Sequence, residues 1–228
     1  MWLFYIGLEP FVRRQWPGSL VSWNRALAGS FRDPLIGRDL LVEFMLGVLE
    51  SLLRVLRYHL ASWIGVPQAP PYQAALFVPL NIFTGAPATV SRLSDAVLWS
   101  IAGSFLLLFL LFLLRVLLRR DWIAVALALV LWTGIQGPTF YSLFPNLLFV
   151  ALYIGASLFV LFRYGLLAYT SYLLWASIFT GFPITTNLSA WYSGIGLAGL
   201  ALLLGLAGYA FHISLGGQPL FARASLED

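Results

Sequence analysis

Five ionisable residues share one face of a helix that the sequence predicts over residues 40–64. At about 100° per residue they fall within about 60° of one another. They are Asp39, Glu43, Glu50, Arg54 and Arg57. Charged side chains that face lipid are strongly disfavoured, so this charge stripe is expected to face the bundle, another subunit or water. Glu50 and Arg54 are spaced i, i+4 in the order that favours an ion pair. We interpret the stripe as structural pairing, with a conduction or proton path as the alternative.

The two histidines, His59 and His212, belong to no cluster with metal-ligand spacing. His212 ends a stripe of small residues spaced by three and four positions. The small-residue stripe is Gly194, Ala198, Ala201, Gly205 and Gly208. Small side chains let a second helix backbone approach closely, so we interpret the stripe as a helix-packing seam. The alternative is a flat ring on the stripe, with His212 as axial ligand of a haem or chlorophyll. His59, opposite the charge stripe, is a second candidate for that role.

Sequence motifs for catalysis are missing. The sequence contains no P-loop, no GxGxxG fingerprint and no GxSxG nucleophile elbow. Because the chain has no cysteine, disulfides, thiolate metal sites and a cysteine nucleophile are excluded. We predict that the chain is not an enzyme, that it has no catalytic or metal-binding residue, and that it needs no cofactor unless the ring alternative holds.

The composition is that of a membrane protein. Hydrophobic residues make up 61% of the 228 residues, charged residues make up 10%, and the mean hydropathy is +0.88. Soluble domains have about 25% charged residues. The thirteen positive residues are all arginine, and they flank apolar stretches, where membrane topology and anionic lipids explain them better than nucleic acid does. We assign the tryptophans and tyrosines to belts at the membrane interface.

The apolar stretches predict an all-α, polytopic transmembrane bundle of about six full spans. Residues 1–8 are interpreted as the end of an apolar helix of a longer polypeptide, and residues 9–38 as a basic cytoplasmic segment lying at the membrane surface. The bundle occupies residues 39–228, with Asp39 as the first helix cap and a proline-rich extracytoplasmic loop at 65–95. The later helices are expected at 96–118, 122–141, 147–182 as a pair turning near 163–165, and 189–214.

The arginines fix the expected orientation. Alternating through these spans places the 9–38 segment, the turn at 119–120, Arg163 and Arg223 on one side, and only Arg92 on the other. Because cytoplasmic loops carry the excess of arginine, the N-terminal segment and the C-terminus are expected in the cytoplasm.

Short polar motifs occur between the apolar stretches. They are LEPFVRRQWP at 8–17, SW at 22–23, RDPLIGRDLL at 32–41, LRVLLRRDW at 114–122, FPIT at 182–185, SAWY at 189–192 and GQPLF at 217–221. These motifs resemble the C-terminal multi-span membrane region of bacterial serine/threonine protein kinases, especially acidobacterial ones. The resemblance covers essentially the whole chain and implies that a cytoplasmic kinase domain precedes it. The kinase glycine-rich loop, VAIK, HRD and DFG motifs are absent, so no catalytic residue carries over.

We therefore expect a non-catalytic membrane domain of the bacterial inner membrane. It would serve as an anchor and as a sensing or assembly module, in contact with lipids and with other membrane subunits or further copies of itself. One alternative is a stand-alone accessory subunit of a photosynthetic or respiratory membrane complex. Another is a component of a transporter or channel, because ionisable residues inside a membrane often mark a functional path.

Overall fold

The computed structural model describes residues 17–63, 80–135 and 143–217, together with residues 7, 9, 10, 14 and 65. Every regular element in these ranges is helical, as predicted. Two short 3-10 helices are η1 (Pro17–Leu20) and η2 (Leu80–Thr84). The α-helices are α2 (Val21–Leu27), α3 (Pro34–Trp63), α4 (Ala86–Leu118), α5 (Asp121–Ile135), α6 (Leu143–Arg163), α7 (Leu166–Gly181) and α8 (Ser193–Ser214). Most of the expected helix at 1–8, most of the proline-rich stretch and the tail at 218–228 lie outside the described residues.

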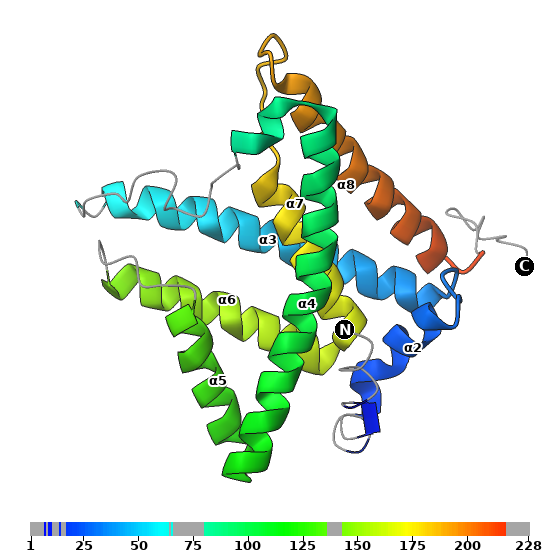
Figure 1. Ribbon diagram of the computed structural model, residues 1–228, viewed down its shortest axis with the longest axis vertical. Helices are drawn as coiled ribbons and strands as arrows, with labels where there is room; N and C mark the ends of the chain where they lie inside the picture. Colours follow the sequence, from blue (N-terminus) through cyan, green and yellow to red (C-terminus); the bar gives the residue numbers. More distant parts are fainter. Residues whose placement is uncertain are drawn as a thin grey trace, which may run out of the picture.

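Helix α7 forms the centre of the arrangement. It packs extensively against both α3 and α4, and α3 also packs along α8. Figure 1 shows α4 running lengthwise through the view. Helix α3 crosses behind α4 and extends on both sides of it, α6 extends to one side, and α5 returns beside the far end of α4. The polar residues of α3 are therefore brought against α7 and α6 rather than left on an outer surface.

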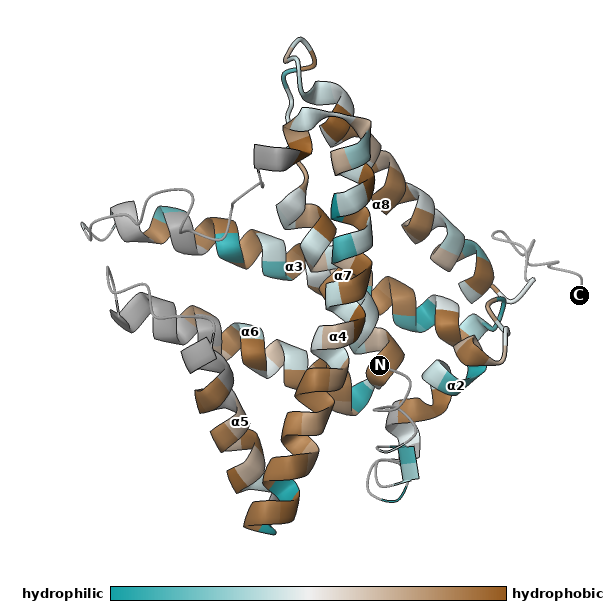
Figure 2. Cartoon of the chain, viewed as in Figure 1, coloured by the Kyte–Doolittle hydropathy of each residue, from teal (hydrophilic) through white to brown (hydrophobic). Residues whose placement is uncertain are grey.

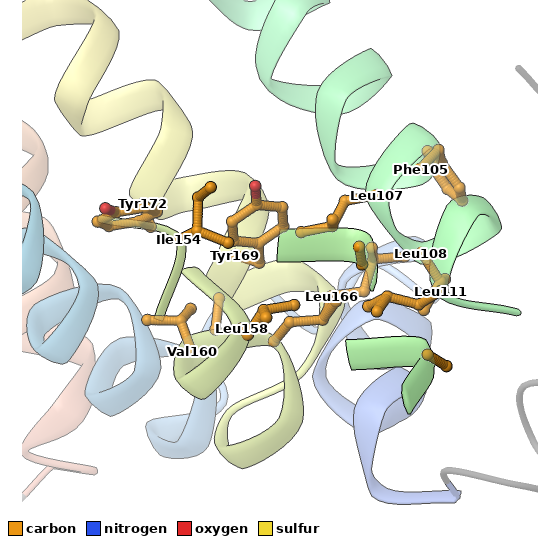
Figure 3. Close-up of a cluster of buried hydrophobic side chains, with 14 of the residues drawn as sticks. Phe105, Leu107, Leu108, Leu111, Ile154, Leu158, Val160, Leu166, Tyr169 and Tyr172 are labelled. Atoms are coloured by element: carbon orange, nitrogen blue, oxygen red, sulfur yellow. The ribbon is translucent and has the colours of Figure 1, made fainter. Parts of the chain in front are cut away.

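The main core lies where α4, α6 and α7 meet (Figure 3). Leu107 and Leu111 of α4 pack there with Ile154 of α6, and all three are almost fully buried. Tyr169 and Tyr172 of α7 belong to the same cluster and are both 0% exposed. Their burial departs from the expectation that the tyrosines form interfacial belts, because α7 is enclosed by other helices on several sides.

Helix α3 begins at Pro34, six residues before the expected start. Asp33 precedes it, and the side-chain oxygen of Asp33 accepts the backbone N–H of Leu35 at 2.9 Å. Proline suits the first turn of a helix, since it has no N–H to leave unpaired. Asp39 is therefore not the cap that the sequence predicted but a buried residue in the second turn of α3.

Replacing Asp33 by alanine is expected to lower the thermal unfolding midpoint at neutral pH, because the helix loses its N-terminal cap. The backbone N–H of Leu35 and the Arg25 guanidinium hold the pKa of Asp33 below its ordinary value of 3.8. A lowered pKa stabilises the fold above that ordinary value, and the stabilisation is lost as the pH falls through the pKa in the folded state. The difference between the two proteins should therefore shrink below pH 3.8. A constant difference across a pH titration of thermal unfolding would contradict this assignment.

Two connections between the later helices contain a residue with positive φ. Arg119 ends α4 in the left-handed region with φ 55°, and Gly165 separates α6 from α7 with φ 95°. The second turn lies where the sequence places it. The loop expected at 65–95 is shorter than predicted, because α4 begins at Ala86 with Pro87 in its first turn and so includes ten residues assigned to the loop.

Two of the described helices, α4 and α8, are long and apolar enough to cross a membrane. The described helices therefore do not support the six spans expected from the sequence. Helix α7 has 16 residues, or about 24 Å at about 1.5 Å per residue, against a hydrocarbon core of about 30 Å. Helix α3 is long enough but carries the charge stripe. Figure 2 shows hydrophobic residues concentrated on α4, α5 and parts of α6 and α8, with hydrophilic residues interrupting α3.

Candidate functional site

The charge stripe of α3 faces the interior of the helix bundle. Asp39, Glu43 and Glu50 are 2%, 0% and 5% exposed. The side chain of Arg57 lies outside the described part of the structure, although its backbone belongs to α3. The sequence left the bundle, another subunit or water as possible surroundings of the stripe. The structure places its acidic residues in the interior of the bundle.

Glu50 and Arg54 form an ion pair one helical turn apart. The Nε of Arg54 donates to Oε1 of Glu50 at 2.6 Å, and the Nη2 group donates to the same oxygen. Arg54 also lies over the ring of Tyr153 on α6, with its guanidinium carbon 5.1 Å from the ring centroid. The charge of Arg54 is thus balanced by a carboxylate on its own helix and by an aromatic face on a neighbouring helix.

Several polar atoms close to this pair make no hydrogen bond of good geometry within the described residues, although Tyr172 lies near Glu50 and Tyr153, and Tyr169 lies near Tyr172 and Ser157. These atoms are the second carboxylate oxygen of Glu50 and the hydroxyls of Ser157, Tyr169 and Tyr172. Buried polar groups are nearly always satisfied, so these atoms are places where a water molecule or another polar group would be stabilised. We call Glu50, Arg54, Tyr153, Ser157, Tyr169 and Tyr172 the buried polar cluster. No sequence pattern indicates its α6 and α7 members, because only the packing of three helices brings them together.

A second polar contact joins α2 to α3. Ser22 on α2 donates its hydroxyl to Asp39 at 2.7 Å, and Arg38 contacts the other oxygen of Asp39 at 2.8 Å. Trp23 lies edge-on to Phe105 of α4, with ring centroids 5.3 Å apart. The segment expected at the membrane surface is therefore attached to the bundle by a buried hydrogen bond and an aromatic contact.

Glu43 has no polar partner among the described residues. It is 0% exposed, and neither carboxylate oxygen has a hydrogen-bond partner within the described residues. The indole N–H of Trp175 on α7 is likewise buried without a partner. A buried polar group without a hydrogen bond destabilises a fold, so Glu43 is retained at a cost in stability.

Replacing Glu43 by methionine, which has a similar length and no unmet polar group, is expected to raise the free energy of unfolding. The gain should be about 1–3 kcal/mol, the penalty for a buried polar group without a partner. The measurement is thermal unfolding in detergent followed by circular dichroism, with Glu43→Gln as the matched variant that keeps a polar group and should gain little. A loss of stability in Glu43→Met alone would mean that the carboxylate makes a stabilising contact in the native protein.

The small-residue stripe of α8 faces outward. All five of its residues are exposed, and a Cβ added to Gly194, Gly205 or Gly208 would meet nothing within 4 Å. The inward face of α8 carries other residues, namely Gly196, Gly199, Leu203, Ala210 and Ile213. The stripe is therefore not the seam by which α8 packs within the described chain, because that contact uses the opposite side of the helix.

The histidines lie on two different helices. His59 in α3 and His212 in the last turn of α8 are both exposed. Among the described residues, no three histidine, aspartate or glutamate side chains lie together in a way that could hold a metal ion. Each candidate axial ligand is thus an imidazole on an exposed face of its helix.

The comparisons with known proteins give no further guide to function. No protein-family model, no curated protein and no solved structure matches this chain.

Proposed function

We propose that the chain is a non-catalytic integral membrane domain of a bacterial cytoplasmic membrane. It anchors a larger assembly and serves as a sensing or assembly module, similar to the membrane part of the bacterial serine/threonine kinases that its motifs resemble. Its basic N-terminal segment and its C-terminus lie in the cytoplasm, and its helices form a bundle of about six crossings. Lipids surround it, together with other membrane subunits or further copies of the chain.

The outward apolar surface of α4 and α8 is the observation that carries this proposal. Only 33% of the most apolar stretch of α4 and 22% of that of α8 are buried. On α4, Leu98, Trp99 and Leu117 are 64%, 71% and 69% exposed. The core helix of a soluble protein would bury such side chains, and water around them would be unfavourable. A bilayer provides the apolar surroundings that these helices lack within the chain.

The inward polarity of α3 supports the same proposal. Its carboxylates point into the bundle, where Arg54, Ser22 and Arg38 pair with two of them. An apolar outside with paired charges inside is the arrangement that a bilayer imposes. Helices α5, α6 and α7 then complete the bundle, and the bilayer thins locally where α7 is shorter than its hydrocarbon core.

The proposal is tested by alkaline carbonate extraction of membranes from cells that express the native protein. The fraction that resists extraction is then analysed by intact mass and peptide mapping. The expected result is resistance to carbonate, with kinase peptides in a polypeptide well above the 25.3 kDa of this chain. Release by carbonate would overturn the membrane assignment, and a carbonate-resistant protein near 25.3 kDa would overturn the kinase association.

A second candidate function is an accessory subunit of a larger membrane complex, photosynthetic or respiratory. The exposed small-residue stripe of α8 favours it, because a smooth helix face allows close approach by a helix of another chain. The test is purification in mild detergent, with companions at fixed stoichiometry as the expected result. His212, which ends the stripe, is the residue to replace if such a complex carries a haem or chlorophyll, and a change in the absorption spectrum would be the readout.

A further inference from the structure

A cleft opens beside the turn that joins α2 to α3. It has a volume of about 650 Å³ and is lined by residues 29–34 and by Tyr209 of α8. The hydroxyl of Tyr209 reaches the backbone carbonyl of Phe31 at 3.5 Å. The cleft therefore lies between the start of α3 and the end of α8.

Close contact between these two helices holds the walls of the cleft in place. A Cβ added at Gly37 would lie 2.6 Å from Cγ1 of Ile213 and from the backbone nitrogen of Ser214. Pro34 approaches Gly216 just beyond the end of α8. Since the helix backbones are this close, the turn at residues 29–33 is supported on one side by α8.

The cleft carries a surplus positive charge. Arg25 pairs with Asp33, and Arg38 pairs with Asp39. The carboxylate of Asp33 also caps α3 through Leu35. Arg32 lines the cleft, is exposed, and makes no ion pair within the described residues. Both acids near the cleft are thus already engaged, and the Arg32 guanidinium is available for a negatively charged ligand.

Two aromatic side chains line the same cleft as this arginine. Phe31, next to Arg32, is 57% exposed, and Tyr209 is 46% exposed. A free inorganic anion would gain nothing from these side chains. A lipid would use them, because its phosphate lies beside its glycerol and the start of its acyl chains, where aromatic and apolar side chains are favoured.

We propose that this cleft binds the phosphate of an anionic phospholipid through Arg32. The inference rests on the membrane location proposed above, in which residues 9–38 and the end of α8 share the cytoplasmic leaflet. Guanidinium groups bind phosphate oxygens in two-point contacts. The bound headgroup links the start of α3 to the end of α8 and so closes the bundle at the membrane surface.

Native mass spectrometry of the full chain, released from detergent micelles, tests this proposal. The probe is phosphatidylglycerol, with phosphatidylcholine of the same acyl chains as the neutral control. Arg32→Gln is expected to lower phosphatidylglycerol binding about fivefold, the loss expected for one arginine–phosphate contact at a membrane surface. Arg32→Lys keeps the charge and should bind between the two. The matched control is Arg120→Gln, which removes an exposed arginine at the α4–α5 turn and should leave binding unchanged.

Three outcomes would overturn the proposal. The first is equal retention of the two lipids, and the second is equal phosphatidylglycerol binding by Arg32→Gln and the unchanged protein. The third is inorganic phosphate alone filling the Arg32-dependent site, which would exclude a lipid as the ligand. Carbonate extraction of the same preparations separates this inference from the proposed function. A protein released by carbonate contradicts the membrane assignment, whereas a resistant protein with any of the three outcomes contradicts the lipid site alone.

Discussion

Replacing Arg54 by leucine is expected to lower the free energy of unfolding by about 3 kcal/mol. Removing one partner of a buried ion pair costs about 3–5 kcal/mol, because the remaining charge stays buried without compensation. The lower end applies because the side chain of Arg54 is 28% exposed, whereas that of Glu50 is 5% exposed. The variant also loses the contact with the ring of Tyr153. Thermal or denaturant unfolding in detergent, followed by circular dichroism, measures the difference.

The double variant Glu50→Leu/Arg54→Leu separates pairing from packing. Removing both charges leaves no uncompensated carboxylate, so the double variant should recover most of the stability that Arg54→Leu loses. Arg120→Leu, at an exposed position outside the bundle, should change stability by no more than about 0.5 kcal/mol. If Arg54→Leu were as stable as the unchanged protein, the structural interpretation of the pair would be wrong. A conduction or proton path would then be the better explanation for these charges.

Replacing Gly196 by alanine is expected to destabilise the protein by about 1–3 kcal/mol, the usual cost of overpacking. The new Cβ would lie 2.3 Å from the carbonyl oxygen of Pro183, a backbone atom that cannot rotate away. At Gly199 a Cβ would lie 2.6 Å from the ring of Phe182, which is itself buried. Gly196→Ala and Gly199→Ala should therefore each separate α8 from the segment that follows α7.

The matched controls are Gly205→Ala and Gly208→Ala on the outward face of the same helix. A Cβ at either position meets nothing within 4 Å. Alanine favours a helix over glycine by about 0.5–1 kcal/mol, so each control should be at least as stable as the unchanged protein. Destabilisation by the controls in the isolated chain, with Gly196→Ala unaffected, would show that the small-residue stripe packs within the chain after all.

The sequence located the ends of helices better than their starts. Helix α4 ends at Leu118 and α8 at Ser214, as predicted, and α6 and α7 meet at Tyr164 and Gly165. The predicted starts of α3 and α4 are too late, because the sequence pattern assigns Pro34 to a turn and Pro87 to a loop. Each proline lies instead in the first turn of a helix, where its fixed φ is favourable and its missing N–H costs nothing.

The candidate site was predictable only in part. The spacing of Glu50 and Arg54 on one helix is enough to predict their pair. Tyr153, Tyr169 and Tyr172 join them through tertiary packing, which no local pattern encodes. Helix α8 carries glycines on both faces, so the sequence could not tell which face packs. Gly196 and Gly199 meet the segment that follows α7, whereas the more regular stripe through Gly205 lies outside.

Single-cysteine labelling of intact cells tests the central claim most directly, because the chain has no cysteine of its own. Ser30→Cys, Arg120→Cys and Ser189→Cys each place a thiol at an exposed position between helices. The account predicts that a membrane-impermeant maleimide labels the cysteine at position 189 from outside, and those at positions 30 and 120 only after the membrane is permeabilised. Labelling of all three without permeabilisation, or of positions 30 and 189 from the same side, would contradict a bundle with this orientation.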